Sequence, residues 1–464
     1  MNVRLISCLL FVLCFTTNGN SQELSVLSFD AYMAYVKNEH PVVKQAGLVL
    51  SESEAYAMKA RGAFDPKLNI DKTSKEFKNK SYYDKLQAGL SIPVGYGLSI
   101  KGGYALNSGV YLNPENKLPT DGLYSAGVSL SLAKGFIMNR QMATLKKAKL
   151  YQKQAVADNQ LLVSDVLYQA ALAYFKWLQY YKEQEVYKDY EINAKERFVG
   201  VKRGYALGDK PAIDTIEAKI SWRTRTLSYQ KAKLSFAKST LELSNYLWMD
   251  NLPISVSDSL QPQTVINTIL PTDNLSVLES QKMRIDAGHP KLTSLSYKLD
   301  GMDVTRRLQR NNLLPTLNLQ YNFLSDARAI STFGLDNYKA GVEFKLPLFL
   351  RKERANLKLI ELKIQDVNYE KALVTLGLEN KLKAVNQEIN AYTSQIQTAE
   401  SLVDEYKILL KGETRKFDLG DSSLFLINSR ESKLIGNKLK LIDLENDLLG
   451  AKAKRFNVLG LVSY

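Results

Sequence analysis

Cysteine and histidine are the scarcest reactive residues in this 464-residue sequence. The two cysteines, Cys8 and Cys14, both lie close to the N-terminus. The two histidines, His40 and His289, are each followed directly by proline, which removes a backbone donor and marks a helix interruption. Metal and catalytic sites that depend on thiols or on clustered imidazoles are therefore not expected, and we predict that the chain binds no metal and no cofactor.

The sequence also lacks the local motifs of common enzymes. It contains no phosphate-binding glycine-rich loop, no nucleophile elbow and no HExxH helix. After the N-terminal segment there is no apolar run of the ~18 residues that a membrane-spanning helix needs. A secreted hydrolase hidden in a helical body has no residues to support it, so we predict that the protein is not an enzyme.

Residues 1–21 have the features of a secretory signal peptide. Arg4 precedes an almost unbroken apolar run over residues 6–15, and small residues follow before position 22. Removal of this segment would leave a chain without cysteine, which suits export to an oxidising compartment. The formal net charge of +14 can indicate nucleic-acid binding. Because lysine and arginine are interleaved with acidic residues along predicted helices, we predict a solvated helix surface and no nucleic-acid partner.

The strongest periodicity lies in residues 378–410, where apolar residues recur at gaps that alternate between four and three. This pattern predicts a helix with one narrow apolar stripe that a second helix covers, as in a coiled coil. No proline interrupts it, and the helix is expected to run for roughly 70 residues at ~1.5 Å per residue, up to Gly420-Asp421. Residues 138–207 show the same spacing. Return helices are expected up to about residue 248 and over residues 422–461.

Several features occur twice in the same order. The same sequence distance separates His40-Pro41 from His289-Pro290 and Pro66 from Pro315. Further correspondences link Ala126-Gly127-Val128 with Ala340-Gly341-Val342, and the Leu-Gly-Asp run at 207–209 with that at 419–421. A shared order over such lengths indicates an internal duplication. We predict a first repeat over residues 22–250, a linker over 251–274 that contains three prolines, and a second repeat over 275–464.

Short segments with strict alternation of apolar and polar residues precede each long helix. They lie within residues 66–132 and 315–348, with long helices over 138–248 and 351–462. A soluble sandwich strand could show this alternation, but one tight connection beside long polar loops favours a transmembrane barrel. Residues 86–94 and 98–106 either span the membrane, giving six strands, or form an external hairpin, leaving four. We favour insertion, and because the smallest known barrels have ~8 strands, several chains must share one barrel.

This duplicated arrangement resembles the TolC-like outer membrane efflux protein family over essentially the whole mature chain. The resemblance rests on Pro-x-Leu-x-Leu strands, Ala-Gly-Val strands, long helices and aromatic-x-Leu-Gly-Asp turns, each present twice, with residues 346–349 at the family's strand-end motif. It implies a mainly α fold with a membrane β-barrel. Three chains would form one outer membrane barrel that is continuous with a periplasmic α-helical tunnel.

The resemblance also implies a function. The protein would be the outer membrane channel-tunnel of a tripartite efflux or type I secretion system, a passive duct for exported small molecules or proteins. Its partners would be two further copies, a periplasmic adaptor (membrane fusion) protein, a proton-driven or ATP-driven inner membrane pump, and outer membrane lipid. It would lie in the cell outer membrane and extend into the periplasm. The alternative is a soluble periplasmic coiled-coil adaptor or scaffold. The cargo and the pump do not follow from the sequence.

In that family the turns between long helices contact the adaptor. On residue chemistry alone, a Gly-Asp turn is an ordinary helix stop, in which glycine adopts a left-handed conformation and aspartate can cap the next helix. The resemblance assigns the adaptor contact to Tyr205, Leu207, Gly208, Asp209, Phe417, Leu419, Gly420 and Asp421.

Two features depart from the family pattern. Some relatives narrow the tunnel mouth with acidic residues six and nine positions after the turn glycine. The first half has Asp214 and Glu217 there, but the second half has Leu426 and Ser429, which puts a cation-selective gate in doubt. The second departure is the additional strand pair within residues 86–106, where the family has a single up-and-down pair.

Overall fold

The computed structural model describes residues 26–256, 260–264, 285, 288–329 and 334–462. The expected signal peptide, with both cysteines, lies outside the described residues, as does part of the expected linker 251–274. The chain divides into two compact units. The helical unit comprises residues 1–40, 169–272 and 389–450, and the sheet unit comprises residues 41–168, 273–388 and 451–464. Each unit draws on both halves of the sequence, so the division into two repeats stays a prediction.

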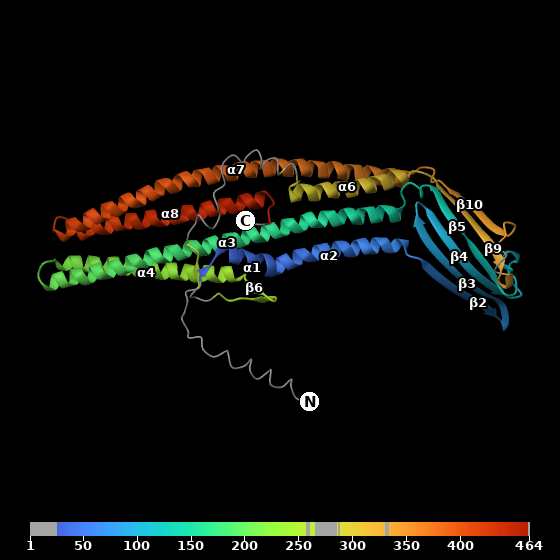
Figure 1. Ribbon diagram of the computed structural model, residues 1–464, viewed down its shortest axis with the longest axis horizontal. Coiled ribbons are helices and arrows are strands. Elements are labelled where there is room, and N and C mark those ends of the chain that lie inside the picture. Colours follow the sequence, from blue (N-terminus) through green and yellow to red (C-terminus); the bar gives the residue numbers. More distant parts are fainter. Residues whose placement is uncertain (1–25, 257–259, 265–284, 286–287, 330–333, 463–464) are drawn as a thin grey trace, which may run out of the picture. The chain divides into compact units, whose positions relative to one another are not determined.

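The order of a helix, strands, a long helix and a shorter return helix occurs twice along the chain (Figure 1). After α1 (Phe29–Glu39), the first series is α2 (Pro41–Arg61), β2 (Lys67–Phe77), β3 (Lys80–Gly95), β4 (Leu98–Ser108), β5 (Leu123–Ala133), α3 (Arg140–Ala206) and α4 (Ala212–Ser244). The second series is α6 (Pro290–Asn311), β9 (Thr316–Asp326), β10 (Tyr338–Lys345), α7 (Arg351–Asp418) and α8 (Leu424–Val458). The two long helices have 67 and 68 residues, as their periodicity predicted.

The six long strands form a single antiparallel sheet in the order β10-β9-β5-β4-β3-β2. The two additional segments of the first half therefore lie inside β3 and β4, hydrogen-bonded between β2 and β5. They do not form a sheet of their own, and their insertion into a membrane stays a prediction. Strands β2 and β10 are the two edges of this sheet, and each has one side without a strand partner among the described residues.

The register places apolar side chains on one face of the sheet. Leu130 of β5 pairs with Leu98 of β4 and with Leu319 of β9, and Val128 in the same strand pairs with Ile100 and Tyr321. Directly paired residues in antiparallel strands point to the same face, so these rows form one apolar surface. Serine, lysine, asparagine and glutamine alternate with them on the opposite face. The alternation that predicted the strands thus becomes two faces of opposite polarity.

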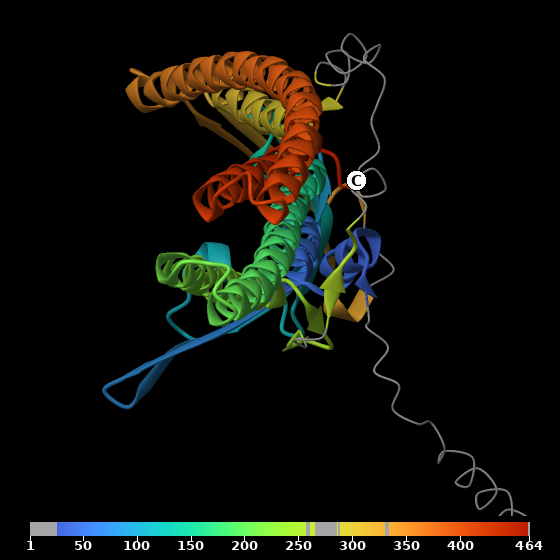
Figure 2. The same cartoon turned by 90° about the vertical axis from the view of Figure 1, so that its left-hand side faces the viewer.

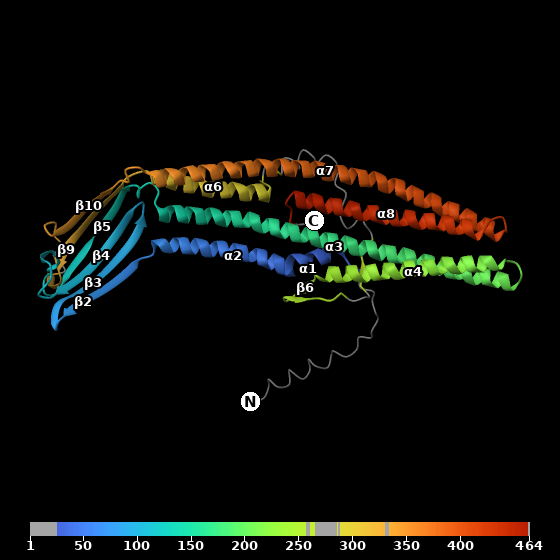
Figure 3. The same ribbon diagram turned by 180° about the vertical axis from the view of Figure 1, so that it is seen from behind.

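The helical parts of the sheet unit have a thin core. In Figures 1 and 3, which show opposite sides, α2, α6 and the sheet-proximal parts of α3 and α7 lie side by side. Their contacts are small residues such as Ala57, Ala60 and Ala148. A second cluster joins Leu292 of α6 to Leu382 of α7. Short links connect each of these helices to a strand. All four helices therefore lie at the same end of the strands.

The helical unit has an aromatic core. Trp177 and Tyr174 of α3 are fully buried beside Tyr32 of α1. The indole Nε1 of Trp177 donates to Thr240 Oγ1 of α4 at 3.0 Å, and the Tyr32 hydroxyl donates to the Ala170 carbonyl at 3.2 Å. Burial raises the pKa of Tyr174 to about 12. The polar groups of Trp177 and Tyr32 thus have hydrogen-bond partners, which makes the burial of these two side chains favourable.

The first return helix is shorter than the sequence predicted. The return helix of the first half ends at Ser244, before the expected residue 248, because β6 (Trp248–Met249) and β7 (Leu252–Pro253) form a hairpin there. The residues between these strands, Asp250 and Asn251, have positive φ angles. In the part of the chain that the structure describes, no helix combines the length and the apolar character needed to cross a membrane.

Candidate functional site

The two helix turns of the helical unit have nearly the same backbone geometry. At the end of α3, the Gly208 N–H donates to the Tyr205 carbonyl at 3.0 Å and the Asp209 N–H donates to the Gly204 carbonyl at 2.9 Å. At the end of α7, the Gly420 N–H donates to Phe417 at 3.1 Å and the Asp421 N–H donates to Lys416 at 2.8 Å. This pair of bonds defines a Schellman motif, which satisfies the last carbonyls of a helix.

Glycine is required at the centre of each turn. Gly208 has φ +82° and Gly420 has φ +85°, in the left-handed region that other residues avoid. The expectation that aspartate caps the next helix is wrong. The residue before α4 is Pro211, without a side-chain cap, and the first turn of α8 uses Ser423, whose Oγ accepts from the Leu426 N–H at 3.4 Å. The aspartates instead contribute their backbone N–H groups to the motif.

The structure brings the two turns together (Figure 2, where they face the viewer). Lys210 Nζ lies 4.4 Å from the centre of the Phe417 ring, a cation–π contact. Behind it, Val201, Ala218 and Leu424 form a buried cluster against which Phe417 packs. The corresponding aromatic residue of the first turn, Tyr205, is exposed. The two turns are therefore alike in backbone but different in surface.

Apolar side chains at the tips remain uncovered within the chain. Leu207 is 71% exposed and Leu419 is 70% exposed. Asp209 and Asp421 are exposed beside them. Of the eight residues predicted for adaptor contact, seven are exposed and only Phe417 is half-buried. These side chains form an accessible surface at the tips, and their contact with an adaptor stays a prediction.

The two tunnel-mouth candidates lie in different surroundings. Glu217 of α4 accepts a hydrogen bond from Asn428 Nδ2 of α8 at 3.1 Å. Asn428 Oδ1 in turn accepts from Ser221 Oγ at 3.0 Å. Asp214 is half-buried one turn before Glu217. Glu217 is therefore part of a polar contact between the two hairpins of one chain, and its role at a tunnel mouth stays a prediction.

A buried ion pair beside this contact was not predicted from the sequence. Arg197 NH1 of α3 lies 2.9 Å from Glu431 Oε2 of α8, and the Glu431 side chain is only 1% exposed. Arg197 also donates to Asn428 Oδ1 at 3.3 Å. Burial, with the nearby Glu431 charge, raises the pKa of Tyr190 to about 12. A charge buried this deeply needs its partner, so the pair fixes α8 against α3 near the turns.

The described residues contain no group of three or more His, Cys, Asp or Glu side chains that could hold a metal ion. Both histidines lie at helix interruptions. His40 follows α1 and stacks on Tyr246, and His289 caps α6. The interpretation of the His-Pro pairs as structural breaks is confirmed for these two positions.

Part of the chain matches a known protein family. Residues 284–460 match the family model of the outer membrane efflux protein, which covers less than half of the chain. A search of curated protein sequences gives no significant match.

Solved structures match over nearly the whole length. The outer membrane channel CmeC of Campylobacter jejuni aligns with a TM-score of 0.65 at 13% identity, over 93% of this chain and 85% of its own. The open state of the outer membrane channel MtrE of Neisseria gonorrhoeae aligns with a TM-score of 0.68 at 13% identity, over 96% and 94%. The outer membrane protein VceC of Vibrio cholerae aligns with a TM-score of 0.65 at 14% identity, over 93% and 96%.

These relatives are channels and not enzymes. Identities this low establish the fold and leave the cargo open. The resemblance found in the sequence is thus confirmed: residues 284–460 carry the signature of the outer membrane efflux protein family, and the chain has the fold of TolC-like outer membrane channels.

Proposed function

We propose that this protein is the outer membrane channel-tunnel of a tripartite efflux or type I secretion system. It would act as a passive duct through which small molecules or proteins leave the cell. In this proposal the six-stranded sheet lies in the outer membrane and the helices extend into the periplasm. The adaptor binds at the two helix turns, and an inner membrane pump, proton-driven or ATP-driven, supplies the energy.

One observation carries the proposal: a six-stranded sheet with one largely apolar face and two edges that are unpaired among the described residues, attached by short links to long helices. In a bilayer every strand edge must be paired, because lipid cannot hydrogen-bond to backbone groups. The edges β2 and β10 therefore need partners from other chains. The apolar face, with Val128, Ile100 and Leu90 exposed in the single chain, suits contact with lipid.

A second feature supports an assembly of several chains. Along α4, every seventh residue is a large apolar side chain that is exposed in the single chain: Ile213, Ile220, Leu227, Leu234 and Leu241. With one apolar residue per heptad it is narrower than the two-position seam of a coiled coil, but it still offers a continuous apolar line that another helix can cover. We define it as the α4 stripe. Together with the open strand edges, it supports three copies around one axis, as the family resemblance implies.

Three copies of a six-stranded sheet would make a barrel of about 18 strands. With a strand spacing of about 4.8 Å and a tilt of about 40°, such a barrel is roughly 35 Å wide, against roughly 24 Å for about 12 strands. Because β3 and β4 are paired into the sheet, we propose the wider form. The cargo itself is selected by the pump.

Cysteine labelling tests the membrane assignment. The sequence has no cysteine after residue 14, so single cysteines at Leu90 and Ile100 report only on β3 and β4. We expect both positions to resist water-soluble maleimide in intact outer membranes, because their side chains face lipid. A cysteine at Val110, in the loop after β4, is the matched control and should react readily. Rapid labelling at positions 90 and 100 would exclude lipid-facing strands there.

The alternative function is a soluble periplasmic coiled-coil adaptor or scaffold. Its long helices would be the same, but the apolar face of the sheet would have to pack against protein. Cell fractionation separates the two functions. Recovery of the protein in the soluble periplasmic fraction without detergent would support the adaptor and exclude the channel.

A further inference from the structure

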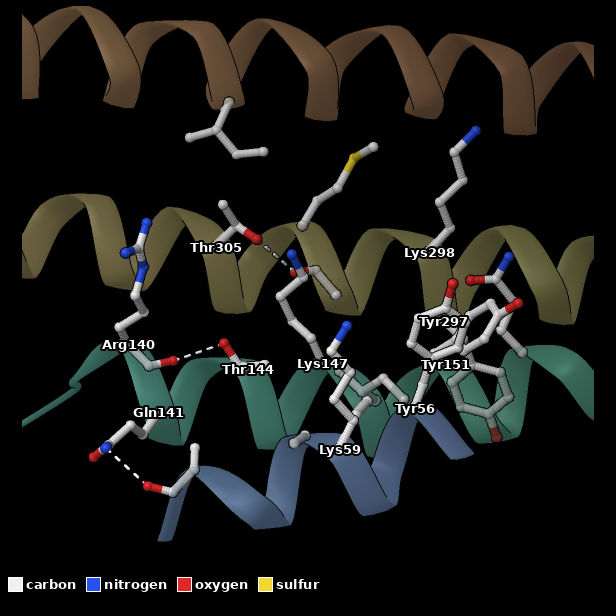
Figure 4. A pocket seen from close by; sticks show the side chains of 18 of the residues that line it. Tyr56, Lys59, Arg140, Gln141, Thr144, Lys147, Tyr151, Tyr297, Lys298 and Thr305 are labelled. Carbon is white, nitrogen blue, oxygen red and sulfur yellow. Dashed lines mark hydrogen bonds between the residues drawn. The ribbon is translucent and has the colours of Figure 1, made fainter. Parts of the chain in front are cut away.

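A cavity of about 1000 Å³ lies in the sheet unit among α2, α3, α6 and α7 (Figure 4). Part of its lining is apolar, from residues such as Ala60, Met302 and Ile360. Three tyrosines, Tyr56, Tyr151 and Tyr297, lie together at one end of the cavity in Figure 4. Tyr56 and Tyr151 meet edge to face at 5.6 Å. Its volume and its mixed apolar and aromatic lining suit a small organic molecule.

The charged side chains that line this cavity are all positive. They are Lys59, Arg140, Lys147, Lys298 and Lys363, which come from all four helices, and the lining includes no aspartate or glutamate. Lys298 is paired with Glu370 at 3.2 Å. The other four form no ion pair within the described part of the chain. Figure 4 shows Lys59, Arg140 and Lys147 extending from α2 and α3 into the space between the helices.

Along α3 the lining cations have no acidic neighbours in sequence, whereas α6 carries Asp300 and Asp303 beside the lining residues Gly301 and Met302. Residues 134–157 contain six lysines and arginines and no acidic residue. The next acid, Asp158, already accepts hydrogen bonds from Ser294 Oγ at 2.6 Å and from Gln154 Nε2 at 3.3 Å. Residues 218–241 also contain six lysines and arginines and no acidic residue, but they lie in α4 and do not line this cavity. A group of cations around an apolar floor suits an anion with an apolar body.

We propose that this cavity binds a small organic anion with an apolar or aromatic body, such as an aromatic phosphate or sulfonate. The cations would hold the anionic group, and the tyrosines and aliphatic side chains would hold the body. A lipid phosphate offers the same anionic chemistry, but a volume of this size is typical of sites for compact organic ligands, so we commit to a soluble anion. The binding site is inferred from the cavity alone. The further step, that the bound anion is exported cargo, rests on the proposed function.

Equilibrium dialysis of the purified full-length protein in mild detergent tests this site, with 1-naphthyl phosphate as the probe. We expect saturable binding that neutral 1-naphthol and inorganic phosphate do not match. The double variant Lys147→Gln, Lys363→Gln should weaken binding by about 2- to 25-fold, because each exposed charge contact contributes a factor of about 1.4 to 5. The matched control is Lys146→Gln, Lys149→Gln, which removes the same charge from α3 outside the lining and should leave binding unchanged.

Each other result would overturn a stated part of the proposal. If both double variants lost the same affinity for 1-naphthyl phosphate, the probe would bind through general surface charge and not at this cavity. Equal binding of naphthol would remove the role of the cations, and displacement by phosphatidylglycerol nanodiscs but not by phosphatidylcholine nanodiscs would make a lipid the occupant. Channel conductance in planar bilayers is measured on the same samples. A conducting protein that binds no naphthyl phosphate would refute the anion site and leave the proposed function standing.

Discussion

Gly208 and Gly420 are the residues on which the two helix turns depend. Both have positive φ angles, and a Cβ built on either would meet no atom within 4 Å. A larger side chain would therefore be opposed by backbone conformation alone and not by crowding. This makes the two positions suitable for changing the tip surface without disturbing a core.

The double variant Gly208→Val, Gly420→Val should impair export while sparing assembly. A β-branched residue in the left-handed region costs about 1–2 kcal/mol, so each turn should shift away from its Schellman geometry. The exposed Leu207 and Leu419 beside the glycines would then be displaced. We expect normal amounts of assembled protein in the outer membrane, weaker adaptor binding in a pull-down, and reduced export.

Gly200 and Gly412 provide a matched control for this experiment. Each lies eight residues before its turn glycine, inside α3 or α7, with helical backbone and open space around its Cβ position. The variant Gly200→Val, Gly412→Val should export like the wild type. If the turn variant also binds adaptor and exports normally, the turns are only helix stops and the assigned contact surface is wrong.

The sequence could predict these turns but not the ion pair beside them. A glycine followed by aspartate after a long periodic helix is a local signal, and both turns lie where it indicated. Arg197 and Glu431 are 234 positions apart, and nothing near either residue marks it as buried. Such a pair becomes visible only when α8 is placed against α3. Asp209 and Asp421 show the opposite error, since a local capping rule predicted a role that Ser423 takes at α8 and that the N-cap residue of α4, Pro211, does not fill.

At the scale of elements, the long helices and most strands follow from periodicity. The stripe in residues 378–410 is confirmed by burial of Leu382, Val385, Ala399 and Val403. The alternation in β5 and β9 predicted their two faces. The second half of β2 could not be predicted, because Lys72, Ser74 and Glu76 leave no apolar face there. Its conformation comes from the ladder with β3, which is a contact outside the segment.

His289 is the N-cap of α6, and its protonation should weaken that helix. Its Nδ1 accepts from the Lys291 N–H at 3.1 Å, and its Nε2 lies 3.1 Å from the Val458 carbonyl. Only the neutral ring with the proton on Nε2 satisfies both contacts. Burial lowers the pKa of His289 below its ordinary value of 6.5. The free energy that this contact contributes is thus fully present above about pH 6.5 and is lost as the pH falls below it.

Hydrogen exchange of the first α6 amides measures this effect. Between about pH 7.5 and about pH 5.5, protection of these amides, corrected for intrinsic exchange, should fall in the wild type. It should fall less in His289→Asn, because asparagine caps a helix without titrating in this range. Both proteins should carry His40→Asn, since burial also lowers the pKa of His40. Equal loss of protection in the two proteins would contradict a role for His289 protonation.

At the scale of the whole molecule, the single chain is incomplete in two places. Within the part of the chain that the structure describes, β2 and β10 are open edges of the sheet, and the α4 stripe leaves five large apolar side chains exposed. Soluble monomers rarely expose such a surface without a partner. The need for several chains was predicted from the number of strands, but the α4 stripe was not predicted, because periodicity shows that an apolar stripe exists and not which helix covers it.

The α4 stripe should be required for assembly. The double variant Leu227→Glu, Leu234→Glu places two charges in the middle of it. Each leucine lost from a buried contact costs about 1.5–3 kcal/mol, and a buried unpaired carboxylate costs more. We expect native mass spectrometry in mild detergent to show trimers for the wild type and mainly monomers for this variant. The fold of each chain should persist, because both leucines are exposed within it, at 67% and 57%.

Two other exposed apolar residues give the control for added charge. Val110 and Leu335 lie in loops beside the sheet and are 86% and 77% exposed. The variant Val110→Glu, Leu335→Glu adds the same two charges away from the stripe and should still form trimers. If the stripe variant is also trimeric, α4 does not pack between copies. The open edges of the sheet would then have to hold the assembly alone, and the coiled-coil contact between subunits would be excluded.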